Sequence, residues 1–398
     1  MRPVVGVICE YDPFHIGHAR QFTLIRQQLP DARIVCVMSG CFTQRGMPAL
    51  FAPAFRAEAA LRAGADVVLE LPCTFAVREA ENFALGGVSL LNALGCVTHL
   101  SFGLEMENLP QLQAAAAVLE TPDGFFTDTL HALLAKGSPF SAAQAEAVAA
   151  SLAAGRGNDF PPPEVLSRLL SQPNNILGIC YLRALLRLNS NILPLPVLRV
   201  GRYHANALTR EGYPSATAVR KAYLSGDLSA AEQACGYSLT GIPCHRPEAL
   251  DTVLLHQLRA MDADALRTLP DCTEGLENRI LKAAHTAVSR ADLLSRLKTR
   301  RYTYTRLNRL AAHALLGITA HLLAAHPLPE YARLLGFRQE SRELLTTFRG
   351  SSVPVIAKAA DGNSANPLYA LDACAYDLWA LGAGLPAGLM YQQKIVKC

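Results

Sequence analysis

Residues 4–22 read VVGVICEYDPFHIGHARQF and join a short apolar run to the start of a segment with helical periodicity. The run at 4–9 is apolar at every position, which predicts a strand that is buried on both faces. His15 and His18 then flank the pair Ile-Gly where the next helix is expected to begin. In an α/β sheet, ligands bind beyond the carboxyl ends of the parallel strands, and a helix that begins there offers free N–H groups to an anion. The stretch therefore predicts an α/β fold with an anion site at this turn.

The two histidines form an HxGH motif, which predicts a particular chemistry. From the N-terminus of a helix both imidazoles can face a phosphate chain, and Gly17 leaves room for a nucleotide to come close. Two imidazoles so placed can stabilise the charge that develops as pyrophosphate leaves. The alternative is a pair of unrelated surface histidines. We expect nucleotidyl transfer, with His15 and His18 as the catalytic residues.

Further apolar runs follow the first and alternate with segments of helical periodicity; they lie at 33–38, 66–71, 98–103 and 195–201. Such a pattern predicts a Rossmann-like parallel sheet with helices on both faces. Between residues 104 and 190 the pattern is all-helical, which we interpret as a helical insertion before the last strand. After residue 227 the chain is again mostly helical, with one short strand candidate at 352–358. We therefore expect a catalytic domain at 1–226 and a mostly α-helical C-terminal domain at 227–398.

The composition indicates a globular chain. Of the 398 residues, 51% are hydrophobic and 18% are charged, and no long polar tract suggests disorder. No apolar stretch reaches the roughly 20 residues that a membrane span requires, and the N-terminal run lacks the features of a signal peptide. The 11 cysteines are scattered without a CxxC pair, so no structural metal site is expected. These features predict a cytoplasmic protein without a membrane segment.

A second motif stands just past the last predicted strand, where residues 215–220 read SATAVR. Ser215 can cap the following helix, while Thr217 and Arg220 can face the β- and γ-phosphates of a nucleotide. A turn of this Ser-x-Thr-x-x-Arg type accompanies HxGH in the nucleotidylyl-transferase superfamily. By itself the hexamer could be a simple helix cap, and its position relative to HxGH favours the nucleotide site.

Seven blocks, in this order and across nearly the whole chain, resemble the bacterial tRNA(Met) cytidine acetate ligase family of the HxGH nucleotidylyl-transferase superfamily. The blocks are VVGVICEYDPFHIGH, MSGCFTQRGMPAL, RAGADVVLELP, PNNILGICYLRAL, GRYHA with SATAVR, EGLENRI and KTRRYTYTR. The resemblance implies an enzyme that joins acetate to ATP, which gives acetyl-adenylate and pyrophosphate. It then implies transfer of the acetyl group to the wobble cytidine of elongator tRNA(Met), which forms N4-acetylcytidine. ATP would be a substrate, accompanied by Mg²⁺.

The resemblance also implies an ATP site, whose residues are Val7, Ile8, Cys9, Glu10, Tyr11, Asp12, Pro13, Phe14, His15, Ile16, Gly17, His18, Ala19, Arg20, Gly103, Asn174, Asn175, Arg199, Ser215, Thr217 and Arg220. The residues themselves agree at several places. Gly103 ends a predicted strand, where a side chain would block a ligand, although a plain turn glycine fits as well. Asn174 and Asn175 follow a proline at a helix start, so capping is the alternative, and which of them contacts ATP stays open. Arg199 lies in an apolar strand, where a buried cation favours an anionic ligand.

The run KTRRYTYTR at 298–306 is the candidate RNA contact. It interleaves tyrosines with basic residues, a mixture that binds nucleic-acid backbone electrostatically and stacks on exposed bases. The alternative is a solvated helix start. Arg45, in a loop rich in Gly, Ser and Thr, suits a lid or an acceptor contact, and the alternative is a plain surface loop. The predicted tRNA-binding residues are Arg45, Lys298, Arg300, Arg301, Tyr302, Tyr304 and Arg306.

Two other functions compete with this interpretation. One is a small-molecule adenylyltransferase or a pantothenate synthetase-like carboxylate ligase of the same fold. The long region at 227–398 argues against it, because a small acceptor does not require so much additional chain. The other is a non-catalytic RNA-binding protein that keeps a nucleotide fold, and the intact HxGH and SATAVR motifs argue against that. A measurement of whether pyrophosphate release from ATP depends on acetate would distinguish these two functions from the tRNA acetate ligase.

Overall fold

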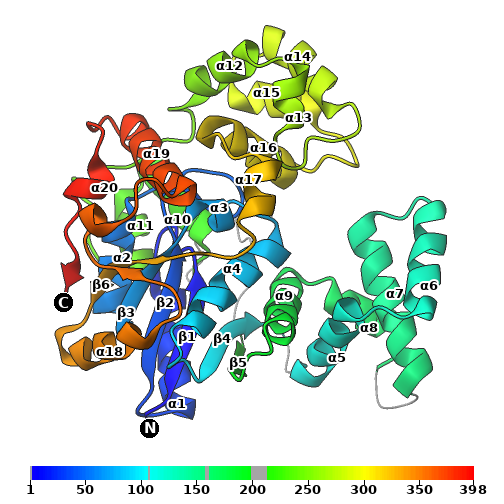
Figure 1. Cartoon of the computed structure of the whole chain (residues 1–398), viewed down its shortest axis with the longest axis horizontal. Helices are drawn as coiled ribbons and strands as arrows, with labels where there is room; N and C mark the ends of the chain where they lie inside the picture. The colour runs from blue at the N-terminus through cyan, green and yellow to red at the C-terminus, as the bar shows by residue number, and fades with distance from the viewer. Residues whose placement is uncertain (1, 106–107, 157–160, 199–212) are drawn as a thin grey trace.

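The computed structural model describes residues 2–105, 108–156, 161–198 and 213–398. A central sheet carries the fold (Figure 1), with the strand order β5-β4-β1-β2-β3-β6-β7 and β8 paired to β6. Its first five strands are parallel and correspond to the five predicted runs, which confirms the Rossmann-like prediction. They are β1 (Val4–Cys9), β2 (Arg33–Ser39), β3 (Val67–Leu71), β4 (His99–Leu104) and β5 (Leu193–Leu198).

Both faces of the sheet are covered by helices, which explains why the strands are apolar throughout. In β1, Val5 and Val7 join one core with Phe22 and Ile25 of α1, whereas Ile8 belongs to a second core on the other face. Alternate strand residues point to opposite faces, so a strand covered on both sides needs apolar residues at every position. The first face is covered by α1 (Ile16–Gln28) and α2 (Pro53–Arg62), and the second by α3 (Cys73–Ala76), α4 (Ala80–Ala93) and α9 (Pro173–Arg187).

The predicted helical insertion lies between β4 and β5. Arg183 of α9 forms ion pairs with Glu81 of α4 (2.7 Å) and Glu120 of α5 (3.3 Å), which attach the insertion to the sheet domain. In Figure 1, α6, α7 and α8 stand away from the sheet. The helices are α5 (Leu109–Glu120), α6 (Gly124–Ala135), α7 (Phe140–Arg156), α8 (Pro163–Leu170) and α9.

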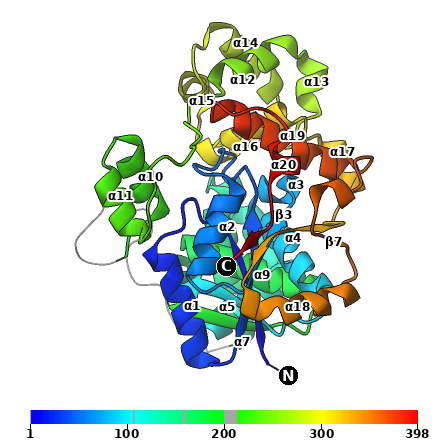
Figure 2. The same ribbon diagram turned by 90° about the vertical axis from the view of Figure 1, so that its left-hand side faces the viewer.

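Residues 251–316 form a helical module with a core of its own, in which Leu254, Ile280, Leu293 and Leu307 are buried together. Figures 1 and 2 both show this module stacked on one end of the sheet domain. It comprises α12 (Asp251–Ala260), α13 (Ala263–Arg267), α14 (Leu276–Thr286), α15 (Arg290–Leu297) and α16 (Tyr304–Leu316), and is preceded by α10 (Ala216–Leu224) and α11 (Leu228–Cys235).

After the module the chain returns to the sheet, which the sequence analysis predicted only in part. The candidate at 352–358 contains β7 (Val355–Ile356), but β6 (Ala332–Phe337), antiparallel to β3, was missed. Strand β6 reads ARLLGF, and its Arg333 is tolerated inside the sheet because it pairs with the buried Glu70 of β3 at 2.5 Å. The domain boundary at 226/227 stays a prediction. Strands β6, β7 and β8, which follow the helical module in the chain, belong to the same sheet as β1 to β5.

The remaining elements of this last part are short, apart from α19. They are α17 (Ala320–Ala325), α18 (Arg342–Thr347), α19 (Pro367–Gly382), α20 (Leu389–Gln392), β8 (Val396–Lys397) and the 3₁₀ turns Gln339–Ser341, Phe348–Gly350 and Ala359–Asp361. Among the helices that the structure describes, none is both long and apolar enough to span a membrane.

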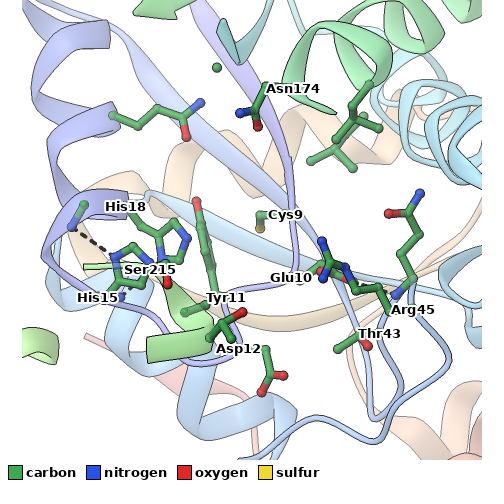
Figure 3. Close-up of a pocket in the computed structure, with 18 of the residues that line it drawn as sticks. Cys9, Glu10, Tyr11, Asp12, His15, His18, Thr43, Arg45, Asn174 and Ser215 are labelled. Carbon is green, nitrogen blue, oxygen red and sulfur yellow. Dashed lines mark hydrogen bonds between the residues drawn. The ribbon is translucent and has the colours of Figure 1, made fainter. Parts of the chain in front are cut away.

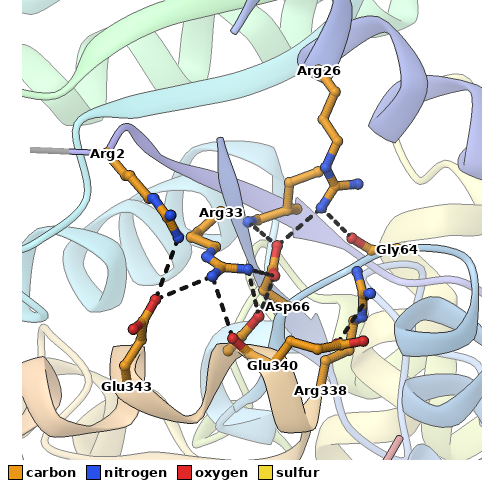
Figure 4. Close-up of polar contacts among 10 residues, drawn as sticks. Arg2, Arg26, Arg33, Gly64, Asp66, Arg338, Glu340 and Glu343 are labelled. Atoms are coloured by element: carbon orange, nitrogen blue, oxygen red, sulfur yellow. Dashed lines mark hydrogen bonds and ion pairs between the residues drawn. The ribbon is translucent and has the colours of Figure 1, made fainter. Parts of the chain in front are cut away.

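A buried carboxylate fixes the amino end of the sheet (Figure 4). Asp66 accepts hydrogen bonds from the backbone N–H of Ile34 (2.7 Å), from Arg26 (3.0 Å) and Arg33 (3.3 Å), and from the hydroxyl of Ser341. The first helix, two strands and the segment before α18 therefore meet at one side chain.

Candidate active site

A cavity of about 490 Å³ opens at the carboxyl ends of the parallel strands. In Figure 3, His15, His18 and Ser215 lie on one side of it, and Glu10, Thr43 and Arg45 on the other. The predicted residues that line it are Ile8, Cys9, Glu10, Tyr11, Asp12, His15, Gly17, His18, Arg20, Arg45, Gly103, Asn174, Ser215, Thr217 and Arg220. Sequence positions more than 200 residues apart thus converge on one space.

The HxGH turn is a helix cap in which each histidine holds the backbone. His15 is the N-cap of α1, and its Nδ1 accepts the N–H of Gly17 at 3.1 Å. His18 reaches back, and its Nδ1 accepts the N–H of His15 at 3.2 Å. The two rings stack with centroids 3.7 Å apart. The sequence folds this way because two orphan N–H groups at the helix start find acceptors in the two side chains.

This capping fixes which ring nitrogen carries a proton. A ring nitrogen that accepts a hydrogen bond bears no hydrogen, so each neutral imidazole must carry its proton on Nε2. The site thus contains two stacked Nε2–H donors at the end of a helix. A side chain at position 17 would disturb this arrangement, because its Cβ would lie 3.0 Å from Nδ1 and Cε1 of His15.

The second motif is joined to the first through Asp12. Ser215 caps α10 by accepting the N–H of Ala218 at 3.1 Å, as predicted for a helix start. Arg220, one turn later, donates to the carbonyl of Asp12, lies 3.3 Å from its carboxylate and donates to Thr217 at 3.2 Å. Asp12 also accepts the N–H of Leu50 at 2.6 Å. A guanidinium and a hydroxyl are thereby held at the cavity beside the HxGH turn.

The two asparagines have different surroundings. Asn174 lines the cavity and donates to Glu105 at 2.8 Å. Asn175 is 1% exposed and lies outside the cavity lining, and its amide donates to the carbonyl of Leu169 at 2.9 Å. Gly103, in β4, lines the same cavity as Asn174. The geometry therefore favours Asn174 over Asn175 as a ligand contact, a choice that the sequence left open.

Some predicted residues do not line the cavity. They are Val7, Pro13, Phe14, Ile16, Ala19 and Asn175. Val7 and Phe14 are core residues, because the strand and the turn that present their neighbours to the cavity must themselves be packed. Arg199 lies outside the described residues.

The segment 41–49 forms a hairpin that closes the other side of the cavity, and we call it the 41–49 hairpin. The N–H of Ala49 donates to the carbonyl of Cys41 (2.8 Å), and that of Thr43 to Met47 (2.9 Å). At its tip, the N–H of Gln44 donates to Oε1 of Glu10 at 2.5 Å. Burial raises the pKa of Glu10 above its ordinary value, although this N–H and the charge of Arg45 act in the opposite direction. Glu10 is thus a half-buried carboxylate held by the hairpin tip.

A profile of the family described as HIGH Nucleotidyl Transferase matches residues 2–388. A protein of Clostridium perfringens (strain SM101 / Type A) named tRNA(Met) cytidine acetate ligase is 33% identical over 390 residues, which cover 95% of this chain and 94% of that protein. The protein of the same name from Halothermothrix orenii is 32% identical over 403 residues, with 95% and 94% covered. This chain belongs to the tRNA(Met) cytidine acetate ligase family.

Two solved structures agree with the tRNA(Met) cytidine acetate ligase family fold. The apo form I of Thermotoga maritima TmcAL matches with a TM-score of 0.89 and 28% identity over 99% of both chains. The form II of that protein, bound with alpha-thio ATP, matches with a TM-score of 0.88 and the same identity and coverage. The family resemblance predicted from the seven sequence blocks is therefore confirmed.

The sequence analysis of this tRNA(Met) cytidine acetate ligase family member missed Arg56. This arginine of α2 is fully buried and donates to the carbonyls of Phe51 and Ser39 (both 3.0 Å) and to those of Glu10 and Gly40. It ties the ends of β1 and β2 to Gly40 and Phe51, which flank the 41–49 hairpin on either side. The available signal was an arginine inside the alanine-rich stretch AFRAEAA, where a buried cation requires acceptors.

The predicted basic run divides between core and surface. Tyr302 is 4% exposed and packs in the helical module, with the guanidinium of Arg306 5.1 Å from its ring. Arg306 itself donates to the carbonyl of Asp271 at 2.7 Å. Lys298, Arg300, Arg301 and Tyr304 are exposed, and Arg301 pairs with Glu274. Only part of the run is therefore available to a partner.

Proposed function

We propose that this protein is an ATP-dependent ligase that activates acetate as acetyl-adenylate and transfers the acetyl group to the wobble cytidine of elongator tRNA(Met), which forms N4-acetylcytidine. The observation that carries the proposal is the stacked His15 and His18 pair, with Arg220 beside it, in a member of this family. The name of the relatives supports the acceptor, and the alpha-thio ATP bound to the Thermotoga maritima protein supports ATP.

In the first step, a carboxylate oxygen of acetate attacks the α-phosphorus of ATP. The bond from this phosphorus to the oxygen that bridges to the β-phosphate breaks, and its electron pair leaves with pyrophosphate. The Nε2–H groups of His15 and His18 are placed to donate to the phosphate oxygens as this charge develops. The guanidinium of Arg220 and the hydroxyl of Thr217 would hold the departing phosphates.

In the second step, the exocyclic amine of cytidine attacks the acyl carbon of the adenylate. The carbon–oxygen bond to AMP breaks, and the amine nitrogen loses a proton. We assign the ATP site to the cavity-lining members of the predicted set, with Asn174 as the asparagine that faces the nucleotide.

Mg²⁺ is proposed to enter with ATP, coordinated chiefly by phosphate oxygens. The described residues contain no group of three or more His, Cys, Asp or Glu side chains suited to a metal ion. Of the carboxylates at the cavity, Asp12 already accepts from Leu50 and lies beside Arg220. Magnesium commonly takes few protein ligands together with substrate phosphates, which agrees with this arrangement.

We propose that tRNA contacts the exposed part of the basic run, namely Lys298, Arg300, Arg301 and Tyr304, together with Arg45 at the cavity. Tyr302 and Arg306 would support this surface from inside the helical module. A cytoplasmic location, where the acceptor tRNA occurs, belongs to the same proposal.

Two measurements test the function. Acetate-dependent exchange of radioactive pyrophosphate into ATP reports the first step, and nucleoside analysis of tRNA(Met) after incubation with ATP and acetate reports the second. We expect exchange together with N4-acetylcytidine. Exchange with unmodified tRNA would instead indicate the small-molecule ligase, and absence of exchange would contradict acetate activation.

A further inference from the structure

The tip of the 41–49 hairpin is held between the cavity and the helical module. On its inner side the tip provides Thr43, Gln44 and Arg45 to the cavity lining, and the N–H of Gln44 binds Glu10. On its outer side the next residue, Gly46, lies against α16. One short turn therefore touches both parts of the molecule.

Gly46 can occupy this position only because it has no side chain. Its φ of +74° lies in the left-handed region that side chains disfavour. A Cβ on Gly46 would lie 2.5 Å from the carbonyl group of Asn308 and from the backbone nitrogen of Arg309. The hairpin tip is thus in backbone-to-backbone contact with the module.

Arg290, the first residue of α15, joins the same two parts by hydrogen bonds. Its Nη2 donates to the carbonyl of Gly46 (2.8 Å) and to that of Asn308 (3.3 Å), and its Nε donates to the side-chain oxygen of Asn308 (3.1 Å). Arg290 is 6% exposed, and burial lowers its pKa to about 10 even though the charge of Asp251 acts in the opposite direction.

A buried guanidinium without a close carboxylate is costly unless its hydrogen bonds are well placed. Among the described residues no carboxylate lies within ion-pair distance of Arg290, so its acceptors are the hairpin and α16. The tip is also stiff, because the N–H of Gly46 donates to Thr43 at 2.9 Å and that of Thr43 to Met47 at 2.9 Å. A displacement of Gly46 would therefore move Gln44 and Arg45 with it.

We propose that Arg290 is a positioning residue for acetate activation: from the helical module it holds the 41–49 hairpin tip against Glu10, so that the ATP cavity is complete only when the module is docked. The inference rests on the proposed function, since it concerns the first half-reaction. Arg290 does not line the cavity and acts through Gly46.

The test compares three variants in acetate-dependent pyrophosphate exchange without RNA. Arg290→Met removes the donors and keeps much of the bulk, and we expect kcat/KM for ATP to fall by about 10²-fold, the size of effect that a 1 Å misplacement can cause. Arg290→Lys keeps one donor for the carbonyl of Gly46 and should restore most of the loss. Arg259→Met is the matched control, because Arg259 also donates to two carbonyls, of Ala284 (2.9 Å) and Ala287 (2.8 Å), but within the module.

A further variant, in the hairpin, disrupts the same contact from its other side. Gly46→Ala should push the tip away from Asn308 and reproduce the loss seen in Arg290→Met. The double variant should lose no more than either single variant, because both break one contact. Melting temperatures of all variants are measured, and exchange is assayed well below the lowest of them.

The outcomes separate the inference from the proposed function. Equal exchange by Arg290→Met and Arg259→Met, or independent losses that multiply in the double variant, would overturn the positioning role while the wild-type protein still activates acetate. If Arg290→Met does not fold, Arg290→Lys and Gly46→Ala decide the matter by the same comparison. Absence of exchange in the wild-type protein would reject the proposed function and the inference with it.

Discussion

The two ends of the sheet use similar polar residues in opposite ways. At the amino end, the buried carboxylate of Asp66 accepts from two arginines, one hydroxyl and one backbone N–H (Figure 4). At the carboxyl end, the half-buried Glu10 accepts the N–H of Gln44 and faces a cavity (Figure 3). At the amino end, which we call the closed end, the polar groups bind only one another. At the carboxyl end, which we call the open end, they leave space for a ligand.

This difference distinguishes a structural polar cluster from a functional one. Where the donors and acceptors saturate one another, as at Asp66, removal of one group should reduce stability. Where side chains converge on a space, as at His15 and His18, removal should reduce activity strongly, while the loss of one helix cap should lower stability by only about 1 kcal/mol.

The largest effect is expected at the closed end. Asp66→Ala leaves the buried N–H of Ile34 without its acceptor and removes the buried carboxylate that Arg26 and Arg33 share, which should lower the free energy of unfolding by about 3–5 kcal/mol. Urea denaturation measures this loss. The exposed Asp31 provides the control, since Asp31→Ala should change stability by no more than about 0.5 kcal/mol. A similar loss in both variants would show that the Asp66 cluster does not hold the sheet.

At the open end, a substitution should reduce catalytic activity more than stability. His18→Ala removes one Nε2–H donor and should reduce acetate-dependent pyrophosphate exchange by about 10²–10³-fold, as loss of an oxyanion donor does. Its melting temperature should change little compared with that of Asp66→Ala. The exposed His321 gives a control variant, His321→Ala, which should exchange at the wild-type rate. Normal exchange by His18→Ala would remove His18 from the catalytic pair.

A buried histidine sharpens the comparison through pH. His313 of α16 is 1% exposed, its Nε2 lies 2.8 Å from the carbonyl of Val77, and burial lowers its pKa to about 4 from the ordinary 6.5. The folded state then binds fewer protons than the unfolded state between these values. This contribution to stability is therefore complete above pH 6.5 and is lost as the pH falls towards 4.

Denaturation of the wild-type protein and of His313→Gln at pH 7 and pH 5 tests the sign. We expect the wild-type protein to lose more stability between the two values, by about 1 kcal/mol per pH unit. His245, whose pKa burial also lowers to about 4, is present in both proteins and cancels in the difference. Equal losses would mean that His313 is not kept neutral by the fold.

The smallest effect is expected on the exposed surface. Arg300 and Arg301 are solvated, so Arg300→Ala/Arg301→Ala should leave folding and pyrophosphate exchange unchanged. If both contact tRNA phosphates, the slope of log affinity against log salt should become shallower by about 1.4–1.8 in filter-binding titrations. Arg349→Ala, at an exposed position outside the module, should keep the wild-type slope. An unchanged slope in the double variant would place the RNA contact elsewhere.

The parts of the site that the sequence predicted are local in the chain. The HxGH turn follows directly from strand β1, and both histidines cap the helix that begins there, so adjacent residues determine its geometry. Strand β1 was predicted for the same reason, since burial on both faces leaves a continuous apolar run. The SATAVR cap needed only its own six residues to be recognised.

The parts that escaped prediction depend on distant partners. Strand β6 is stabilised by β3, and its Arg333 discourages a strand assignment until Glu70 is seen opposite. The alanine-rich surroundings of Arg56 indicate a buried cation, but the acceptors of Arg56 and Arg290 are mainly backbone carbonyl groups, which every residue carries, so the sequence does not reveal the partners. Tyr302 was grouped with its basic neighbours, whereas its position in the module core depends on packing against α14 and α16.

The pairing of β3 with β6 has a consequence for synthesis of the chain. Glu70 and Arg333 are 263 positions apart, so β3 is made long before its partner strand. At roughly 5–20 residues per second, the edge of VVLEL stays uncovered on the nascent chain for on the order of 10–50 s. An apolar, β-branched edge is a template for aggregation while it is exposed. Chaperones that shield strand edges should therefore bind ribosome-attached chains while residues 332–337 are still inside the ribosome, and release them once these residues have emerged and can pair with β3.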